Sequence, residues 1–72
     1  MQTFSVTDRK YVETPKKVIQ FFDEIQSVCK KYNMSISHED IHGAFEIDSY
    51  KEFNIEWLRM AHILFSAEEV GE

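Results

Sequence analysis

The run His38-Glu39-Asp40-Ile41-His42 gathers the side chains of this sequence that could do chemistry. Two imidazoles and two carboxylates lie within five residues, and His62 follows farther along the chain. Such groups ligate zinc, and a histidine beside a carboxylate can act as an acid–base pair. The segment therefore has three interpretations: a metal site, a catalytic site, or the polar tip of a β-hairpin that contacts a partner.

The surrounding sequence favours neither metal binding nor catalysis. Zinc needs three or four converging ligands, and histidines four apart lie on one face of a helix, whereas the loop of a hairpin need not bring His38 and His42 together. The chain has no glycine-rich phosphate loop, and its HExxH string, His38 to His42, falls in a predicted hairpin and not on a helix. Cys29 falls in the apolar stripe of a predicted helix, where a thiol is expected to be inert. We therefore expect no enzyme activity, no catalytic residue, no metal and no cofactor.

Length and charge restrict the class of protein. A domain of 72 residues buries only about 60% of its unfolded surface, so its stability is marginal. The net charge of −5 is uneven: residues 1–37 hold six basic and four acidic side chains, and residues 38–72 hold two basic and nine acidic ones. An acidic half disfavours nucleic acid, and it suits a basic protein surface.

Cysteine and hydropathy indicate the compartment. Cys29 is the single cysteine, so no intrachain disulfide can form, which suits a reducing cytoplasm. The start of the chain lacks the basic and apolar segments of a signal peptide. No apolar run approaches the roughly 20 residues of a membrane span, so we expect no membrane association.

The first helix is predicted at 15–32. Thr14 can cap it, Pro15 suits its first position, and Asn33 suits a left-handed stop. Its buried stripe has helical spacing and comprises Val18, Phe22, Ile25, Cys29 and Tyr32.

A β-hairpin follows, because residues 34–38 and 43–47 alternate between polar and apolar. Pairing Ile36 with Phe45 leaves Glu39-Asp40-Ile41-His42 as a four-residue loop. The apolar side chains then share one face, which we expect both helices to cover. That face comprises Met34, Ile36, Phe45 and Ile47.

A second helix is predicted at 54–66 after a turn at 50–53. Ser49 begins a capping box that ends at Glu52, and Asn54 offers a second cap. The expected buried stripe is Trp57, Leu58, Ala61, Leu64 and Phe65.

The predicted fold is a single α+β domain of helix–hairpin–helix type (αββα) at 14–66, with an acidic tail at 67–72. Residues 1–13 form an arm that is either disordered or an added N-terminal strand. Two short helices cannot cover both faces of a hairpin, so some apolar side chains should stay exposed in a monomer. These candidates are Phe4, Tyr11, Phe21, Phe53 and Ile63. The excess predicts a homodimer.

The stretch YNMSISHEDIHGAFEIDSYKEFNIEWL, within residues 25–60, resembles small bacteriophage and prophage proteins of Gram-positive hosts. These proteins carry an SISHEDxHGAF-like segment followed by a tyrosine, an asparagine and a Trp-Leu helix. The matching residues are Ser35, Ser37, His38, Glu39, Asp40, His42, Gly43, Ala44, Phe45, Tyr50, Asn54, Trp57 and Leu58.

The resemblance implies an accessory phage protein in the host cytoplasm, and such proteins often bind and block host proteins, including defence systems. Our leading prediction is a non-enzymatic inhibitor that binds a host protein through His38, Glu39, Asp40 and His42. The alternative is an oligomer that sequesters a small ligand, such as a nucleotide signal, between subunits. That site would use Arg9, Lys10, His38 and His42.

Overall fold

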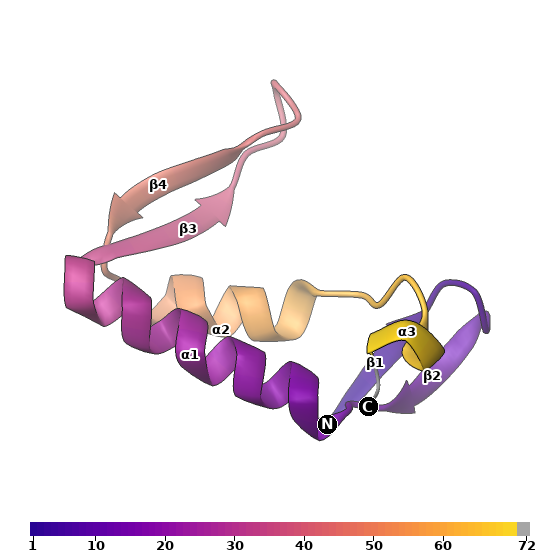
Figure 1. Ribbon diagram of the computed structural model, residues 1–72. Helices are drawn as coiled ribbons and strands as arrows, with labels where there is room; N and C mark the ends of the chain where they lie inside the picture. Colours follow the sequence, from indigo (N-terminus) through magenta and orange to yellow (C-terminus); the bar gives the residue numbers. More distant parts are fainter. Residues whose placement is uncertain (71–72) are drawn as a thin grey trace.

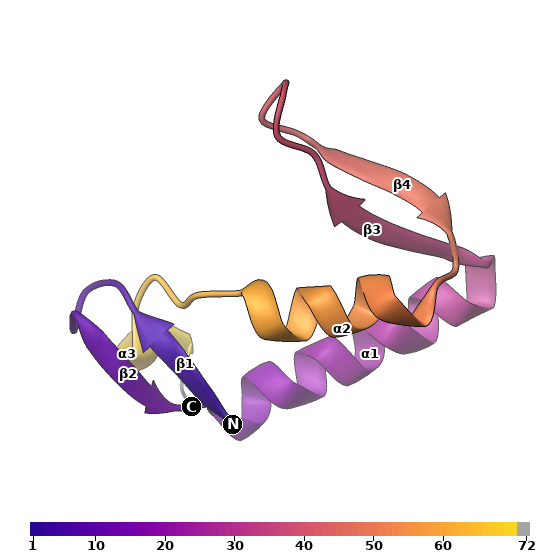
Figure 2. The same cartoon turned by 180° about the vertical axis from the view of Figure 1, so that it is seen from behind.

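The computed structural model of the protein describes residues 1–70 and confirms the α+β class. Its elements are β1 (Gln2–Ser5), β2 (Lys10–Glu13), α1 (Lys16–Tyr32), β3 (Met34–His38), β4 (Phe45–Ser49), α2 (Glu52–Ala61) and the short α3 (Ala67–Val70). Figure 1 shows α1 and α2 side by side, with the β3–β4 hairpin at one end and β1, β2 and α3 at the other. The reverse view shows the same arrangement (Figure 2), so the molecule is a helix pair with a hairpin at each end.

The first helix ends where the sequence predicts, and it begins at Lys16, one residue after the predicted start at 15. Pro15 precedes it, and Asn33 ends it in the left-handed region, with its N–H directed at the carbonyls of Cys29 and Lys30. Thr14 does not cap the helix, because no side chain makes a cap hydrogen bond there. Its hydroxyl lies 2.6 Å from that of Thr3 instead.

The N-terminal arm is ordered as a hairpin of two strands. Phe4 pairs with Tyr11, and Arg9 takes a left-handed conformation in the connecting turn. The free edge of β1 forms a parallel bridge to the segment before α3. The Val6 N–H donates to the Leu64 carbonyl (2.8 Å), and the Leu64 N–H donates to the Phe4 carbonyl (2.9 Å). The arm therefore pairs with strands of its own chain.

That bridge shortens the second helix. The predicted end at residue 66 is wrong: α2 stops at Ala61, and His62 is extended with ψ of 154°. Leu64 takes strand geometry against β1, so the helix cannot continue through it. Leu64 is buried as predicted, but Phe65 is exposed.

The start of α2 also differs from the prediction. The helix begins at Glu52, two residues before the predicted start at 54, and no side chain makes a hydrogen bond at its N-cap, Lys51. Ser49 is the last residue of β4, so the expected capping box does not form. Asn54 lies inside the helix and is buried, where it bonds to the neighbouring hairpin.

The β3–β4 register is shifted by two residues from the prediction. Ile36 pairs with Ile47, and His38 pairs with Phe45, so the loop spans residues 39–44. A shift of two leaves every side chain on its predicted face, because strand side chains alternate with a period of two. The hydrophobic pattern alone cannot distinguish these two registers.

The prediction that the helices cover the apolar face of this hairpin is wrong. Met34, Phe45 and Ile47 are 51%, 62% and 67% exposed. The serine face is covered instead: Ser35 is 1% exposed and Asn54 on α2 is 4% exposed. The small serine lets α2 approach closely, and its hydroxyl is fully paired there.

The core is correspondingly small. Val18, Phe22 and Leu64 form its central cluster, against which Val12, Ile25 and Ala67 pack. The expected surplus of exposed apolar side chains is confirmed for Tyr11, Phe21, Phe53 and Ile63. The acidic segment 67–72 was predicted as a tail: residues 67–70 form α3, and the last two lie outside the described residues.

Candidate functional site

The loop at residues 39–44, here called the hairpin tip, projects away from the helix pair. Both ribbon views show it at the free end of the β3–β4 arm (Figures 1 and 2). Ile41 is 86% exposed, and the side chains of Asp40 and His42 are 81% and 78% exposed. The tip therefore presents one aliphatic side chain between a carboxylate and an imidazole.

Glu39 holds the tip in shape. Its carboxylate accepts hydrogen bonds from the N–H groups of Ile41 (2.8 Å), His42 (3.0 Å) and Ala44 (3.3 Å). It also lies 3.1 Å from His42 Nδ1. The Glu39 side chain is only 14% exposed, unlike its neighbours. Of the residues predicted to bind a partner, Glu39 is thus engaged by the loop itself, whereas Asp40 and His42 face solvent.

The electrostatics of Glu39 follow from these bonds. Burial by itself raises the pKa of this carboxyl group, but the N–H groups of His42, Ile41 and Ala44 and the His42 side chain together outweigh it. The net pKa of Glu39 is lower than that of an ordinary glutamate. The loop is therefore held by a charged acceptor at neutral pH.

His38 lies where the arm meets α2. Its ring contacts Asp40 through Nε2 and lies 5.6 Å from the Trp57 ring, centroid to centroid. The His38 imidazole thus links the hairpin tip to the body of the molecule.

The two histidines of the run do not share a partner. His38 contacts Asp40, and His42 contacts Glu39. Within residues 1–70, no group of three or more histidine, cysteine, aspartate or glutamate side chains is placed to hold a metal ion. The arrangement is a set of local turn contacts.

The base of the hairpin carries a separate ion pair. Lys51 Nζ lies 2.8 Å from Asp48 Oδ2, and the Ser49 N–H donates to Asp48 Oδ1 at 2.7 Å. Lys51, and then the Ser49 N–H, lower the pKa of Asp48. These contacts fasten the end of β4 to the start of α2.

Arg9 and Lys10 lie far from the tip. Arg9 lies in the β1–β2 turn and Lys10 begins β2, at the opposite end of the helix pair from the β3–β4 hairpin (Figure 1). One chain therefore does not bring Arg9 and Lys10 together with His38 and His42. The small-ligand alternative requires a second subunit to complete its site.

A buried polar cluster around His62 escaped the sequence analysis, which considered this residue only as a third metal ligand. His62 Nδ1 lies 2.7 Å from the Arg59 carbonyl, so this nitrogen carries the proton. Nε2 lies 2.9 Å from Thr3 Oγ1, which also contacts Thr14. The cluster joins β1, the segment between β2 and α1, and the end of α2. The sequence held no signal for it: Thr3 belongs to a segment of alternating polar and apolar residues, but alternation does not tell which of the two faces is buried.

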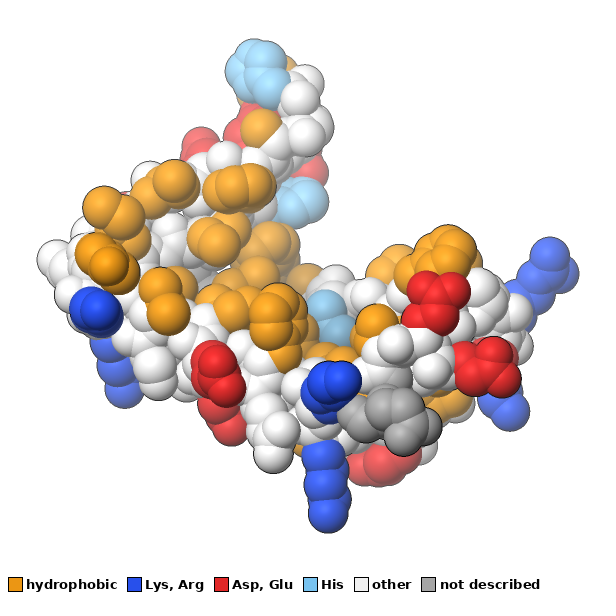
Figure 3. All heavy atoms as spheres, viewed as in Figure 1, with side chains coloured by type: hydrophobic (Ala, Val, Ile, Leu, Met, Phe, Trp, Pro, Cys, Tyr) orange, Lys and Arg blue, Asp and Glu red, His pale blue; other side chains and the backbone are white. Residues whose placement is uncertain are grey.

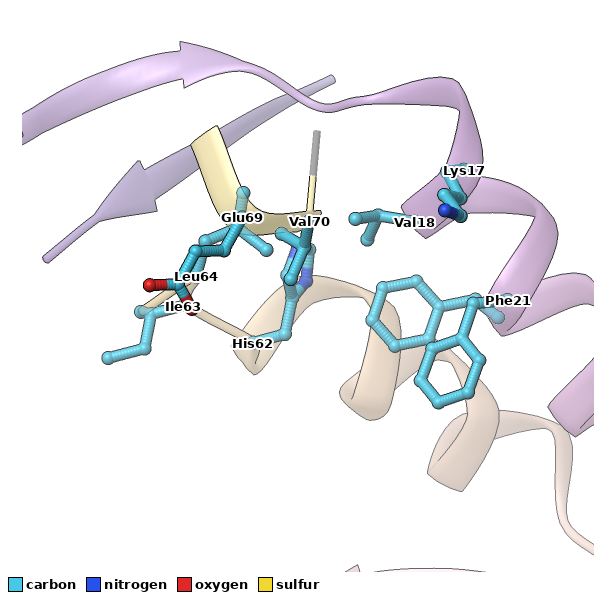
Figure 4. A pocket seen from close by; sticks show the side chains of 9 residues that line it. Lys17, Val18, Phe21, His62, Ile63, Leu64, Glu69 and Val70 are labelled. Carbon is cyan, nitrogen blue, oxygen red and sulfur yellow. The ribbon is translucent and has the colours of Figure 1, made fainter. Parts of the chain in front are cut away.

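A groove of about 490 Å³ lies beside this cluster. Val18 and Phe21 of α1 face His62 and Leu64 across it, and Val70 closes one side (Figure 4). Its lining is mostly apolar, with Lys17 and Glu69 as its charged members. The groove is an open side of the small core.

Comparisons with known proteins add no relative. No family model, curated protein or solved structure matches this chain.

Within the described residues, no helix is both long enough and apolar enough to span a membrane.

Proposed function

We propose that the protein is a small, non-enzymatic binding protein whose hairpin tip docks on a protein of the host cell and inhibits it. The observation that carries this proposal is the combination at the tip of an ordered backbone with exposed side chains. Glu39 fixes the loop, while Ile41, Asp40 and His42 point into solvent.

Order in the free loop favours binding. A loop that is already held in one conformation loses less entropy when it docks than a mobile loop does. Ile41 supplies exposed apolar surface, and burying that surface against a partner makes the free energy of binding more favourable. An exposed aliphatic side chain fixed at the end of a projecting arm suits insertion into a pocket of the partner.

Charge indicates the kind of partner surface. The β3–β4 hairpin, residues 34–49, holds four acidic side chains and no lysine or arginine, and Asp40 lies at the tip itself. A basic surface around an apolar pocket would complement this end of the molecule and speed association. The resemblance to phage proteins is the reason for proposing that the partner is a host protein and that binding inhibits it. The same resemblance supports an anti-defence role.

The test is affinity capture from host lysate with variants that spare the loop clamp. Ile41→Asp and Asp40→Lys alter exposed tip side chains and leave Glu39 in place. Met60→Asp is the matched control, because Met60 is 83% exposed but lies on α2, away from the tip. We expect a protein captured by the parent and the control to be lost with both tip variants. Its isolated form should bind Ile41→Asp at least about tenfold more weakly, a difference of about 1.4 kcal/mol.

Two results would contradict the proposal. One is equal capture of the same protein by the parent and by both tip variants. The other is a captured protein whose activity is unchanged by saturating amounts of the parent, since inhibition would then be absent.

A further inference from the structure

The β3–β4 hairpin and the end of α1 share an exposed apolar face. It comprises Val28, Tyr32, Met34, Ile36, Phe45 and Ile47, which line a shallow groove of about 200 Å³ together with Cys29 and Ser35. Figure 3 shows hydrophobic side chains gathered along this side of the hairpin and the adjoining surface of α1. No lysine, arginine, histidine, aspartate or glutamate lines the groove. This set of residues is called the apolar face below.

The molecule exposes more surface than a compact chain of its size. A compact monomer of 8.6 kDa exposes about 4,700 Å², whereas this chain exposes 5583 Å². The difference of roughly 900 Å² is close to the share of about 800 Å² that each partner buries in a standard interface. The radius of gyration of 13.1 Å likewise exceeds the roughly 11 Å expected for 72 residues.

The small core indicates that the chain would gain stability if this surface were covered. Within the described residues, only five hydrophobic side chains are buried: Val18, Phe22, Cys29, Ile55 and Leu64. A domain this small commonly needs a disulfide, a metal or a subunit contact for stability. Cys29 is a free thiol, so a disulfide within the chain is not available. A second copy of the chain is the partner that is present wherever the chain is made.

The chemistry of the face fits self-association. A twofold contact places the same patch on both subunits, so an apolar patch meets an apolar patch. Each chain carries a net charge of −5, which makes two copies repel one another. The groove is lined by no charged side chain, and Lys31 beside it is a cation whose Nζ lies 5.4 Å from the Tyr32 ring centroid. Two acidic copies can therefore approach one another there with little repulsion.

We propose that two copies of this chain form a homodimer through the apolar face, each seating its β3–β4 hairpin against the Val28–Ile47 groove of the other. The hairpin tips remain outside this contact. The dimer would therefore present two tips, and it is independent of the partner proposed above.

The first test uses the unaltered chain. Sedimentation equilibrium should give twice the mass of one chain, and the melting temperature should rise when the concentration is raised about 100-fold. The dimer should also persist or strengthen between about 0.05 and 0.5 M salt, because salt screens the repulsion between copies. A monomeric mass and a melting temperature independent of concentration would overturn the proposal, and so would a dimer that salt dissociates.

The second test locates the contact. Ile47→Asp and Val28→Asp place a carboxylate in the face from two different elements, so one variant suffices if the other does not fold by circular dichroism. Each should raise the dissociation constant by about tenfold or more, because the dimer would bury two uncompensated charges. Met60→Asp and the tip variant Ile41→Asp should leave the constant unchanged. A dimer that resists the folded face variants, or that Ile41→Asp dissociates, would contradict this interface.

Discussion

Replacing Asn54 by alanine tests whether one buried hydrogen bond fixes the hairpin arm over α2. Asn54 Nδ2 donates to Ser35 Oγ at 2.9 Å, and both residues are buried. Removing one partner of a buried hydrogen bond costs about 1–3 kcal/mol. Ser35 Oγ still donates to the Ser49 carbonyl at 2.7 Å, so only its acceptor side loses a partner. We therefore expect a loss of about 1–2 kcal/mol and a melting temperature lower by about 4–16 °C.

A double-mutant cycle separates this bond from general packing. Ser35→Ala alone should cost more than Asn54→Ala, because it also leaves the Ser49 carbonyl without its donor. The double variant should be about 1 kcal/mol more stable than the sum of the single effects predicts. Urea unfolding at one fixed chain concentration measures all four proteins, and amide exchange of β3 reports on the arm itself. Additive effects, agreeing within about 0.3 kcal/mol, would refute the assigned coupling.

Two further predictions concern the core and the tip. Leu64→Ala should lower the free energy of unfolding by about 2–4 kcal/mol, because it removes the side chain that packs on Val18 and Phe22. Ile63 is exposed, so Ile63→Ala should change this free energy by about 0.5 kcal/mol or less. Urea unfolding measures both variants. Equal effects of these two neighbours would contradict the assigned core. The pKa of the Glu39 carboxyl should lie below that of a glutamate in the unfolded chain in an NMR titration, because the loop N–H groups lower its folded-state pKa. The stability that the Glu39 carboxylate contributes should be complete above its unfolded-state pKa and should be lost as the pH falls through its lowered folded-state pKa. This pH dependence should be absent from Glu39→Gln. A folded-state pKa at or above the ordinary value would contradict the role of Glu39 in holding the loop.

The sequence determined the elements whose signals are local. Pro15 and Asn33 bound α1, because the first fits only the start of a helix and the second accepts a left-handed stop. Alternation in residues 34–38 and 45–47 set which side chains share a face of the hairpin. The cluster from His38 to His42 was correctly located at the hairpin turn, because charged residues and a following glycine interrupt two alternating segments.

The alternation of polar and apolar residues does not tell which face of a strand packs on the helices. The tertiary structure decided which face is buried. In β1 and in β3 the small hydroxyl side is buried: Thr3 meets His62 and Thr14, and Ser35 meets Asn54. Hydroxyl groups behave as interior residues only when distant parts of the chain supply their hydrogen-bond partners. Their burial turns Met34, Phe45 and Ile47 outward and creates the apolar face.

The end of α2 and the order of the N-terminal arm have the same physical origin. Residues up to 66 continue a helical pattern, yet Leu64 leaves the helix because β1 offers its backbone two hydrogen bonds. Local sequence sets the propensity of a segment, and a pairing across sixty residues overrides it. The sequence by itself thus determined α1, the strand faces and the place of the tip. Only the tertiary structure decided the covered faces, the strand at Leu64 and the carboxylate clamp of Glu39, because each depends on partners that come together only in the folded chain.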